Sequence, residues 1–199
     1  ILLYGISQIY GVLGTTQFHE IHVALTENGG VLDSGVLIGL TMIIVGMGFK
    51  IGAVPFHMWV PDVYEGSPTP ITAYLAVGSK AAAFALIMRL FSQGLMPAVD
   101  DWQTIIVILA AATMTFGNLV ALAQHNIKRM LAYSSIGQVG YILMGIAALG
   151  ELTSNGIIFH LAGYGFTTLA AFLCIIIFYN ATGREEIRDY SGLADRSPF

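Results

Sequence analysis

Charge is scarce in this chain, because only 10% of its 199 residues are Asp, Glu, Lys or Arg. Soluble domains carry about 25% charged residues, so this sequence lacks the charge needed to cover a water-facing surface. Its 8 basic residues are outnumbered by 12 acidic ones, which leaves no basic surface for nucleic acid. The composition therefore excludes a disordered protein, a nucleic-acid binder and an ordinary soluble enzyme.

Cysteine is almost missing, since Cys174 is the single one and lies inside an apolar run. One cysteine cannot form a disulfide framework or a cysteine metal cluster within the chain. The sequence motifs of phosphate-binding loops, nucleophile triads and HExxH metal sites are also lacking. We therefore expect neither a catalytic residue nor a metal ligand in this chain.

Hydrophobic residues, by contrast, make up 56% of the chain, and the mean hydropathy is +0.75. A helix crosses the hydrocarbon core of a bilayer with roughly 20 apolar residues. The opening apolar run, residues 1–13, is shorter than this, so the chain is expected to be an internal fragment of a longer protein. We predict an all-α, polytopic transmembrane bundle of about six spans in a single domain. Five apolar stretches have spanning length: residues 36–58, 71–90, 104–123, 130–149 and 156–179.

The basic residues are distributed unevenly between the two predicted sides of the membrane. Side X holds residues 14–35, the turn after Arg89 and the turn around Glu151, and Arg89 is its single Lys or Arg. Side Y also holds residues 61–70, and the Lys128–Arg129 turn on this side is interpreted as a topology anchor. Because cytoplasmic loops carry an excess of Lys and Arg, side Y is predicted to be cytoplasmic. Its five basic residues are Lys128, Arg129, Arg184, Arg188 and Arg196.

Two lysines fall where a membrane helix usually has none. Lys80 lies in the middle of residues 71–90, and Lys50 follows fourteen largely apolar residues. A Lys at the centre of a spanning helix costs about 2.5–3.5 kcal/mol to insert, and such residues usually serve an ion or proton path. Both lysines are therefore candidates for a proton path, although they could instead be inert residues that pair within the bundle or extend to the interface. No Asp or Glu lies within the predicted spans, so an acidic partner has to come from another helix or subunit.

The residues that follow Lys50 are typical of an interrupted helix. Gly52 and Pro55 come directly after it, and proline removes a backbone hydrogen bond and clashes with the preceding turn. Broken helices in the membrane usually line an ion or substrate path, so we predict a functional helix break at residues 50–55. The alternative is a simple proline kink with close glycine packing.

His57 and His160 are further candidates for the proton path, because imidazole titrates near neutral pH. His57 could equally be an interfacial residue beside Trp59. His160 shares a helix face with Tyr164, four residues later, and this pair could equally form a polar contact inside the bundle. Weaker candidates for a wetted path are Ser134, Ser135 and Gln138.

Three longer motifs carry a family resemblance: FKIGAVPFH at residues 49–57, PDVYEGSPTP at 61–70 and QHNIKRMLAYSS at 124–135. With the Ser79–Lys80 pair at the matching spacing, they closely resemble the antiporter-like membrane subunits of proton-pumping NADH:quinone oxidoreductase, respiratory complex I. The VYEG run within the second motif favours the subunit N branch of this family. The resemblance covers essentially the whole chain.

The resemblance implies that the chain forms helices six to eleven of a fourteen-helix subunit built from inverted five-helix repeats. It implies that Lys50, on a broken helix, and Lys80, on the next, belong to a proton path, with the acidic partner of Lys50 outside this chain. NADH, flavin, iron–sulfur clusters and quinone would be bound by partner subunits, with no cofactor in this chain. The expected partners are the lipid of a bacterial inner membrane and other antiporter-like and small membrane subunits.

Two other functions stay open from the sequence. Related membrane subunits occur in multisubunit cation/proton antiporters and membrane-bound hydrogenases, which do not transfer electrons from NADH to quinone. A purely structural scaffold is the second alternative, and in that case Lys50 and Lys80 would be replaceable by Met or Leu without loss of proton transport.

Overall fold

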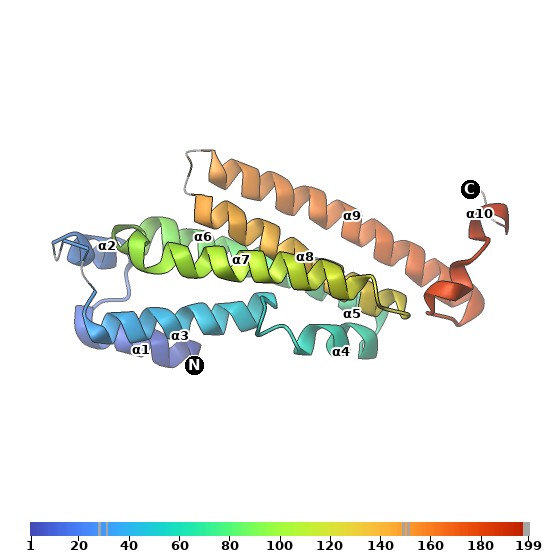
Figure 1. The fold of residues 1–199 in the computed structure, drawn as a ribbon, viewed down its shortest axis with the longest axis horizontal. Helices are drawn as coiled ribbons and strands as arrows, with labels where there is room; N and C mark the ends of the chain where they lie inside the picture. Colours follow the sequence, from blue (N-terminus) through green and yellow to red (C-terminus); the bar gives the residue numbers. More distant parts are fainter. Residues whose placement is uncertain (28, 31, 149, 151, 197–199) are drawn as a thin grey trace.

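The computed structural model describes residues 1–27, 29–30, 32–148, 150 and 152–196. Its long helices lie side by side in an elongated bundle, as Figure 1 shows. The predicted all-α, polytopic membrane fold is confirmed by helices that are long and apolar enough to cross a bilayer. The five within the described residues are Ser34–Ile51, Thr69–Gly94, Met96–Ala121, Ile127–Ala148 and Thr153–Thr182.

The first helix and the first membrane span form an antiparallel pair. Helix α1 (Leu2–Leu13) is too short to span and packs along α3 (Ser34–Ile51). A Cβ atom added at Gly5 would lie 2.7 Å from the carbonyl oxygen of Gly39, so the two backbones nearly touch. Small residues permit such close approach between membrane helices.

Residues 14–35, predicted to be a polar loop, contain a helix instead, α2 (Phe18–Glu27). Its buried residues Ile21 and Leu25 are four positions apart and therefore share one helix face. This face joins the main hydrophobic core. The prediction missed the helix because the polar residues around these two obscure a short apolar stripe.

The span predicted at residues 36–58 is too long, because α3 ends at Ile51. Gly52 follows with φ of 77°, a left-handed conformation that glycine adopts readily. A second helix, α4 (Trp59–Gly66), begins beyond Pro55, so the predicted break near residues 50–55 is confirmed. The turn predicted at residues 61–70 is consequently shorter, since α4 occupies most of it and Pro61 is tolerated in its first turn.

The next span, Thr69–Gly94, is one continuous helix with two π-helical stretches. A π-helical stretch widens the helix locally, and such stretches are frequent at functional sites. The first of them ends directly before Lys80. This helix consists of α5 (Thr69–Tyr74), η1 (Leu75–Ser79), α6 (Lys80–Arg89) and η2 (Leu90–Gly94).

Helices α7 (Val99–Ala121) and α8 (Ile127–Ala148) share the most extensive contact between described helices. A short turn, η3 (Met96–Ala98), precedes α7, which begins earlier than the predicted residue 104. The predicted stretch starts too late because Asp100 and Asp101 interrupt the apolar pattern that defines it. They lie in the first turn of the helix, where acidic side chains interact favourably with the helix dipole. The predicted end of α8 at Leu149 lies outside the described residues.

Helix α9 (Thr153–Thr182) lies on the outside of the bundle and carries many exposed apolar side chains. Phe159 and Phe166, for example, are 82% and 79% exposed. Such a surface is expected of a helix that contacts lipid or a neighbouring membrane subunit. The chain continues into η4 (Ile187–Tyr190) and the short α10 (Leu193–Arg196).

The predicted alternation of the loops between two sides is confirmed by the described residues. On side X, a Cβ atom added at Gly30 would lie 2.8 Å from the carbonyl oxygen of Pro97, so two side X loops meet there. On side Y, Arg129 pairs with Asp62, and the region after α9 lies at the same end of the bundle (Figure 1). Glu151, assigned to side X, lies outside the described residues.

Candidate functional site

Lys80 lies inside the bundle and is only 4% exposed. Its Nζ donates a hydrogen bond to the carbonyl oxygen of Ser135 at 3.2 Å and a second one to the Ser135 hydroxyl. The Tyr64 ring is a third contact, with its centroid 6.0 Å from Nζ. The lysine of one span is therefore held by α8 and α4, at a depth where it cannot extend to water.

Two tyrosine hydroxyls converge on the Ser135 hydroxyl that binds Lys80. The Tyr64 hydroxyl lies 3.4 Å from Ser135 Oγ, and the Tyr164 hydroxyl lies 3.0 Å from it. Tyr164 OH is also 3.3 Å from the carbonyl oxygen of Ala76, in the π-helical stretch η1 before Lys80. We call Lys80, Ser135, Tyr64 and Tyr164 the Lys80 cluster. It joins α4, α6, α8 and α9 through one chain of polar groups.

The Lys80 cluster contains only neutral partners for the ammonium group. Within the part of the chain that the structure describes, no carboxylate forms an ion pair with Lys80. A buried ion without a counter-charge carries a desolvation cost of several kcal/mol. Oxygen atoms of Ser135 are thus the hydrogen-bond partners of the Lys80 ammonium group among the described residues.

Lys50 has a different environment from Lys80. It is exposed, in the last turn of α3, where a cation interacts favourably with the helix dipole. It lines an open cavity of about 670 Å³ together with Tyr74, Gly78 and Ser79. Lys80 does not line this cavity, although the preceding residue, Ser79, does. Its ammonium group binds Ser135 on α8 instead, so the structure does not bring the two lysines together.

The broken segment after Lys50 is held by groups that replace the missing helical hydrogen bonds. The Gly52 N–H donates back to the end of α3, and a Cβ atom added at Gly52 would lie 2.7 Å from Val60 Cγ2. The Val54 N–H donates to Thr113 Oγ1 on α7 at 3.0 Å. The Val54–Pro55 peptide bond is cis. The contact of Val54 with Thr113 therefore ties the break to α7.

The indole of Trp59 provides a further support for the break. Its Nε1 donates to the carbonyl oxygen of Phe49 at 2.8 Å, and the two rings are 5.6 Å apart. This carbonyl belongs to the last turn of α3, where carbonyl groups lack a partner in their own helix. Trp59 therefore has a structural role at the helix break, in addition to its predicted place beside His57.

His57 lies within the break and is buried, with 4% of its surface exposed. Its ring packs edge-on against Phe116, at a centroid distance of 4.6 Å. Neither ring nitrogen has a hydrogen-bond partner among the described residues. The structure does not bring His57 to the Lys80 cluster, so its role in a proton path stays a prediction.

His160 lies beside the Lys80 cluster, on the wall of an open cavity of about 500 Å³. Gln138, Thr167 and Tyr164 line the same cavity. Tyr164 thus lies between His160 and Ser135. It borders the cavity that His160 lines, and its hydroxyl contacts Ser135. The spacing of His160 and Tyr164 predicted their shared face, and the structure adds the contact with Ser135.

Sequence reasoning missed Tyr64 and Thr113 and ranked Ser135 and Tyr164 low. Tyr64 stood in a predicted turn, and Thr113 looked like an ordinary polar residue of a membrane helix. No local sequence pattern indicates either role, because the contacts join distant residues. Ser135 is 71 residues from Tyr64, and Val54 is 59 residues from Thr113.

The Thr113→Val variant tests the support of the helix break. Valine keeps the shape of threonine but removes the acceptor of the Val54 N–H, so a part-buried donor loses its partner. We expect a loss of about 1–3 kcal/mol in the free energy of unfolding, measured as a lower melting temperature of the full-length subunit in detergent. Thr41→Val is the matched control, since Thr41 Oγ1 donates only within α3, to Leu37, at an exposed position. Equal melting temperatures for both variants would contradict this role.

The chain shares its whole length with one protein family. A family described as "NADH:quinone oxidoreductase/Mrp antiporter, TM" matches residues 1–199. NADH-quinone oxidoreductase subunit N of Desulforamulus reducens is 48% identical over 199 residues, which are 100% of this chain and 41% of that protein. The chain thus spans about two fifths of the length of this relative.

Solved structures agree with the sequence relatives. A chain of respiratory complex I from Thermus thermophilus is 32% identical with a TM-score of 0.74, over 99% of this chain and 41% of that one. A chain of the Mrp complex from a Dietzia species is 28% identical with a TM-score of 0.78, over 87% of this chain and 32% of that one. With a family match over all of its residues and this fold, the chain belongs to the transmembrane family of NADH:quinone oxidoreductase and Mrp antiporter subunits.

Proposed function

We propose that this chain forms part of the proton-translocating membrane subunit of a complex I-type NADH:quinone oxidoreductase. The observation that carries the proposal is Lys80, a buried ammonium group in the middle of a membrane span with neutral hydrogen-bond partners. A charged residue at this depth is costly and usually serves transport. The 48% identity with a relative named subunit N supports the assignment to complex I.

The Lys80 cluster supplies the groups that a proton relay needs. Lys80 holds or releases a proton at Nζ, and the Ser135 hydroxyl can accept one hydrogen bond while it donates another. Tyr164 extends this chain of hydroxyls to the cavity that His160 and Gln138 line. We propose that protons move between Lys80 and this cavity through Ser135 and Tyr164, with His160 as a relay.

On the other side of Lys80, the cavity of Lys50 provides a second route of access. Ser79 borders this cavity and is the direct neighbour of Lys80 in the chain. We propose that Lys50 takes up protons from this cavity. Gly52 and Pro55 would end α3 directly after Lys50 and so keep its side chain at the cavity. His57, buried beside Phe116, is proposed as an additional proton carrier at the break.

The redox chemistry is proposed to take place on other subunits. NADH, flavin, iron–sulfur clusters and quinone would be bound there, while this chain would respond to electrostatic changes transmitted through neighbouring antiporter-like and small membrane subunits. The membrane would be a bacterial inner membrane. Side Y, with the Lys128–Arg129 turn, would face the cytoplasm. The distribution of basic residues supports this orientation, because side Y holds five and side X holds one.

The likeness to the Mrp complex supports one alternative, a subunit of a multisubunit cation/proton antiporter. Purification of the full-length protein with its native partners, followed by reconstitution in sealed vesicles, distinguishes the two. We expect NADH-oxidising subunits to copurify and addition of NADH and a quinone to drive proton transport across the vesicle membrane. Partners without NADH oxidation, together with sodium/proton exchange driven by an imposed pH gradient, would contradict our proposal and favour the antiporter.

A further inference from the structure

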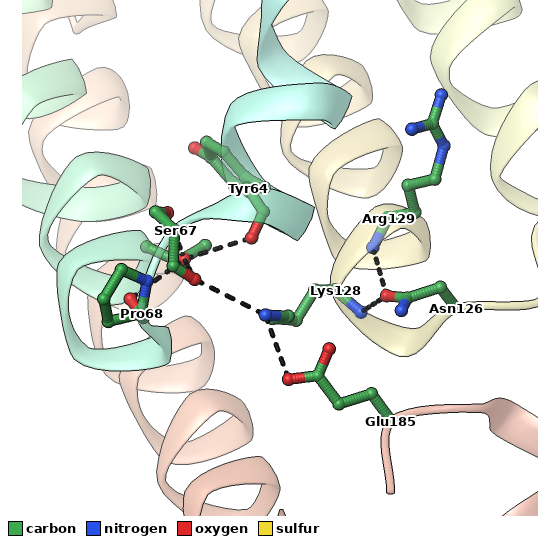
Figure 2. A network of polar contacts seen from close by, with 8 residues as sticks. Tyr64, Ser67, Pro68, Asn126, Lys128, Arg129 and Glu185 are labelled. Atoms are coloured by element: carbon green, nitrogen blue, oxygen red, sulfur yellow. Dashed lines mark hydrogen bonds and ion pairs between the residues drawn. The ribbon is translucent and has the colours of Figure 1, made fainter.

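At the side Y end of the bundle, Lys128 is a second buried lysine, with an exposed fraction of 5%. Its Nζ lies 3.0 Å from Glu185 Oε1 and donates to the carbonyl oxygen of Ser67 at 3.4 Å (Figure 2). Glu185 follows α9, and Ser67 ends α4. One ammonium group thus joins the start of α8 to two other parts of the chain. This is more than the topology anchor that the sequence predicted.

The backbone reinforces the same junction. The Ile127 N–H donates to the carbonyl oxygen of Glu185 at 3.0 Å, and the Ile187 N–H donates to that of His125 at 2.8 Å. Asn126 Oδ1 accepts from the N–H groups of Lys128 and Arg129 and caps α8. The segment after α9 is therefore fixed against the first turn of α8, and Glu185 is held beside Lys128.

Burial distinguishes this ion pair from the others at the same end. The Lys128 and Glu185 side chains are 6% and 22% exposed, whereas those of Arg188 and Glu186 are 80% and 50% exposed. Exposed pairs are worth little because water screens them. A largely buried pair matters more, because removal of one partner leaves the other charge uncompensated.

A short series of contacts leads from Lys128 to the Lys80 cluster. The Thr72 hydroxyl lies 2.8 Å from Ser67 Oγ and 3.2 Å from the carbonyl oxygen of Tyr64. Tyr64 in turn contacts Ser135. Lys128 and Ser135 are seven residues apart on α8, so they share one face and are separated by roughly 10 Å along the helix. The contact between α4 and α8 therefore has the Lys128–Ser67 hydrogen bond at one end and the Tyr64–Ser135 contact of the Lys80 cluster at the other.

We propose that Lys128 is a positioning residue for the Lys80 cluster. Glu185 holds the Lys128 ammonium group against the Ser67 carbonyl at the end of α4, which keeps Tyr64 against Ser135 and couples the cluster to the chain that follows α9. This inference rests on the proposed function, because it concerns proton transfer through Lys80. It adds two residues, Lys128 and Glu185, that act on the relay without belonging to it. Their effect is both geometric and electrostatic.

The electrostatic effect gives the proposal a specific signature. The groups that face Lys80 are Tyr64 on α4 and Tyr164 on α9, and Lys50 lies on the adjacent α3. Arg129, close to Lys128, is compensated by Asp62 and Glu65. Loss of Glu185 would leave the positive charge of Lys128 uncompensated near Lys80 and make protonation of Lys80 less favourable. Loss of Lys128 would leave a negative charge and have the opposite effect.

The test compares Lys128→Met and Glu185→Gln in the full-length subunit, within its complex in sealed vesicles. We expect each variant to lower NADH-driven proton pumping roughly tenfold, because misplaced groups transfer protons slowly. The alkaline limb of the pH profile should move by about one pH unit, to lower pH in E185Q and to higher pH in K128M. The double variant should return the profile to the wild-type pH and keep the loss of rate.

Two controls separate positioning from stability. Lys128→Arg keeps the charge and the donors, so it should pump at close to the wild-type rate. Arg188→Met removes a cation of the exposed pair on the same segment and should change nothing. If K128M fails to assemble, E185Q and K128R still decide the question. Wild-type pumping by assembled E185Q, or shifts of the pH profile in the same direction for E185Q and K128M, would overturn the proposal. If Lys80 variants pump normally, the proposed function itself has failed.

Discussion

Replacement of Lys80 with methionine is expected to stop proton pumping almost completely while the complex still assembles. Methionine matches the length of the lysine stem and suits a site that is 4% exposed, so the packing of the bundle is preserved. The group that carries the proton is lost, and positioned proton carriers contribute about 100-fold or more to transfer rates. Pumping is measured in sealed vesicles as the pH change after addition of NADH.

Lys80→Arg shows whether the charge or the transferable proton matters. Arginine keeps the positive charge near Ser135 but does not give up its proton in proteins. We expect this variant to assemble and to lose pumping like Lys80→Met. If arginine restores pumping, Lys80 provides a fixed charge. If methionine leaves pumping unchanged in a fully assembled complex, the scaffold alternative is correct and the relay is wrong.

Gly117→Leu is expected to have the second large effect, on assembly of the subunit. A Cβ atom added at Gly117 would lie 2.6 Å from the backbone nitrogen of Gly137 and 3.0 Å from the carbonyl oxygen of Tyr133. Both atoms belong to the backbone of α8, which cannot move aside without separating the two helices. Overpacking of this kind costs about 1–3 kcal/mol or more, so we expect a roughly tenfold loss of assembled subunit.

Gly11→Leu is the matched control for this variant. Gly11 lies on α1, and no atom lies within 4 Å of a Cβ atom added there. Both variants replace a helical glycine with leucine, so the main difference between them is the space available for the new side chain. The amount of subunit in the assembled complex, measured on native gels, should fall for Gly117→Leu alone. Equal amounts for both would show that α7 and α8 do not need their close contact.

The α7–α8 contact also bears on the Lys80 cluster. Gly140, one to two turns beyond Ser135 on α8, packs against α7, because a Cβ atom there would lie 2.7 Å from the backbone nitrogen of Met114. The opposite face of α8 presents Ser135 to Lys80. A shift of α8 away from α7 would therefore change the position of Ser135 as well. For this reason, assembly and pumping should be measured separately for each variant.

Some of the site could be predicted from neighbouring residues alone. Lys80 stood out because a charge in the middle of an apolar stretch is rare, and the helix break followed from Gly52 and Pro55. The partners of Lys80 could not be predicted in the same way. Ser135 is 55 residues away in the chain, and no local pattern indicates which hydroxyl of α8 faces the lysine.

The environment of Lys128 could not be predicted from its neighbours in the sequence either. Beside Arg129, at the start of a helix, it resembles any basic residue that anchors a membrane protein. The structure gives the two neighbours opposite environments: Arg129 pairs on the outside with Asp62 and Glu65, and Lys128 is buried against Glu185 and Ser67. The rotation of α8 about its axis decides this difference, and that rotation depends on packing against α4 and α7.

The sequence alone indicates the membrane class, the approximate places of the spans, the helix break and the position of Lys80 inside a span. It could do so because a bilayer requires each span to satisfy its own backbone hydrogen bonds and to expose apolar side chains, and these demands act on consecutive residues. Helix packing sets which side chains meet: Lys80 with Ser135, Thr113 with the break, and Lys128 with Glu185. These contacts join residues far apart in the chain, so they depend on how the helices pack and rotate against one another.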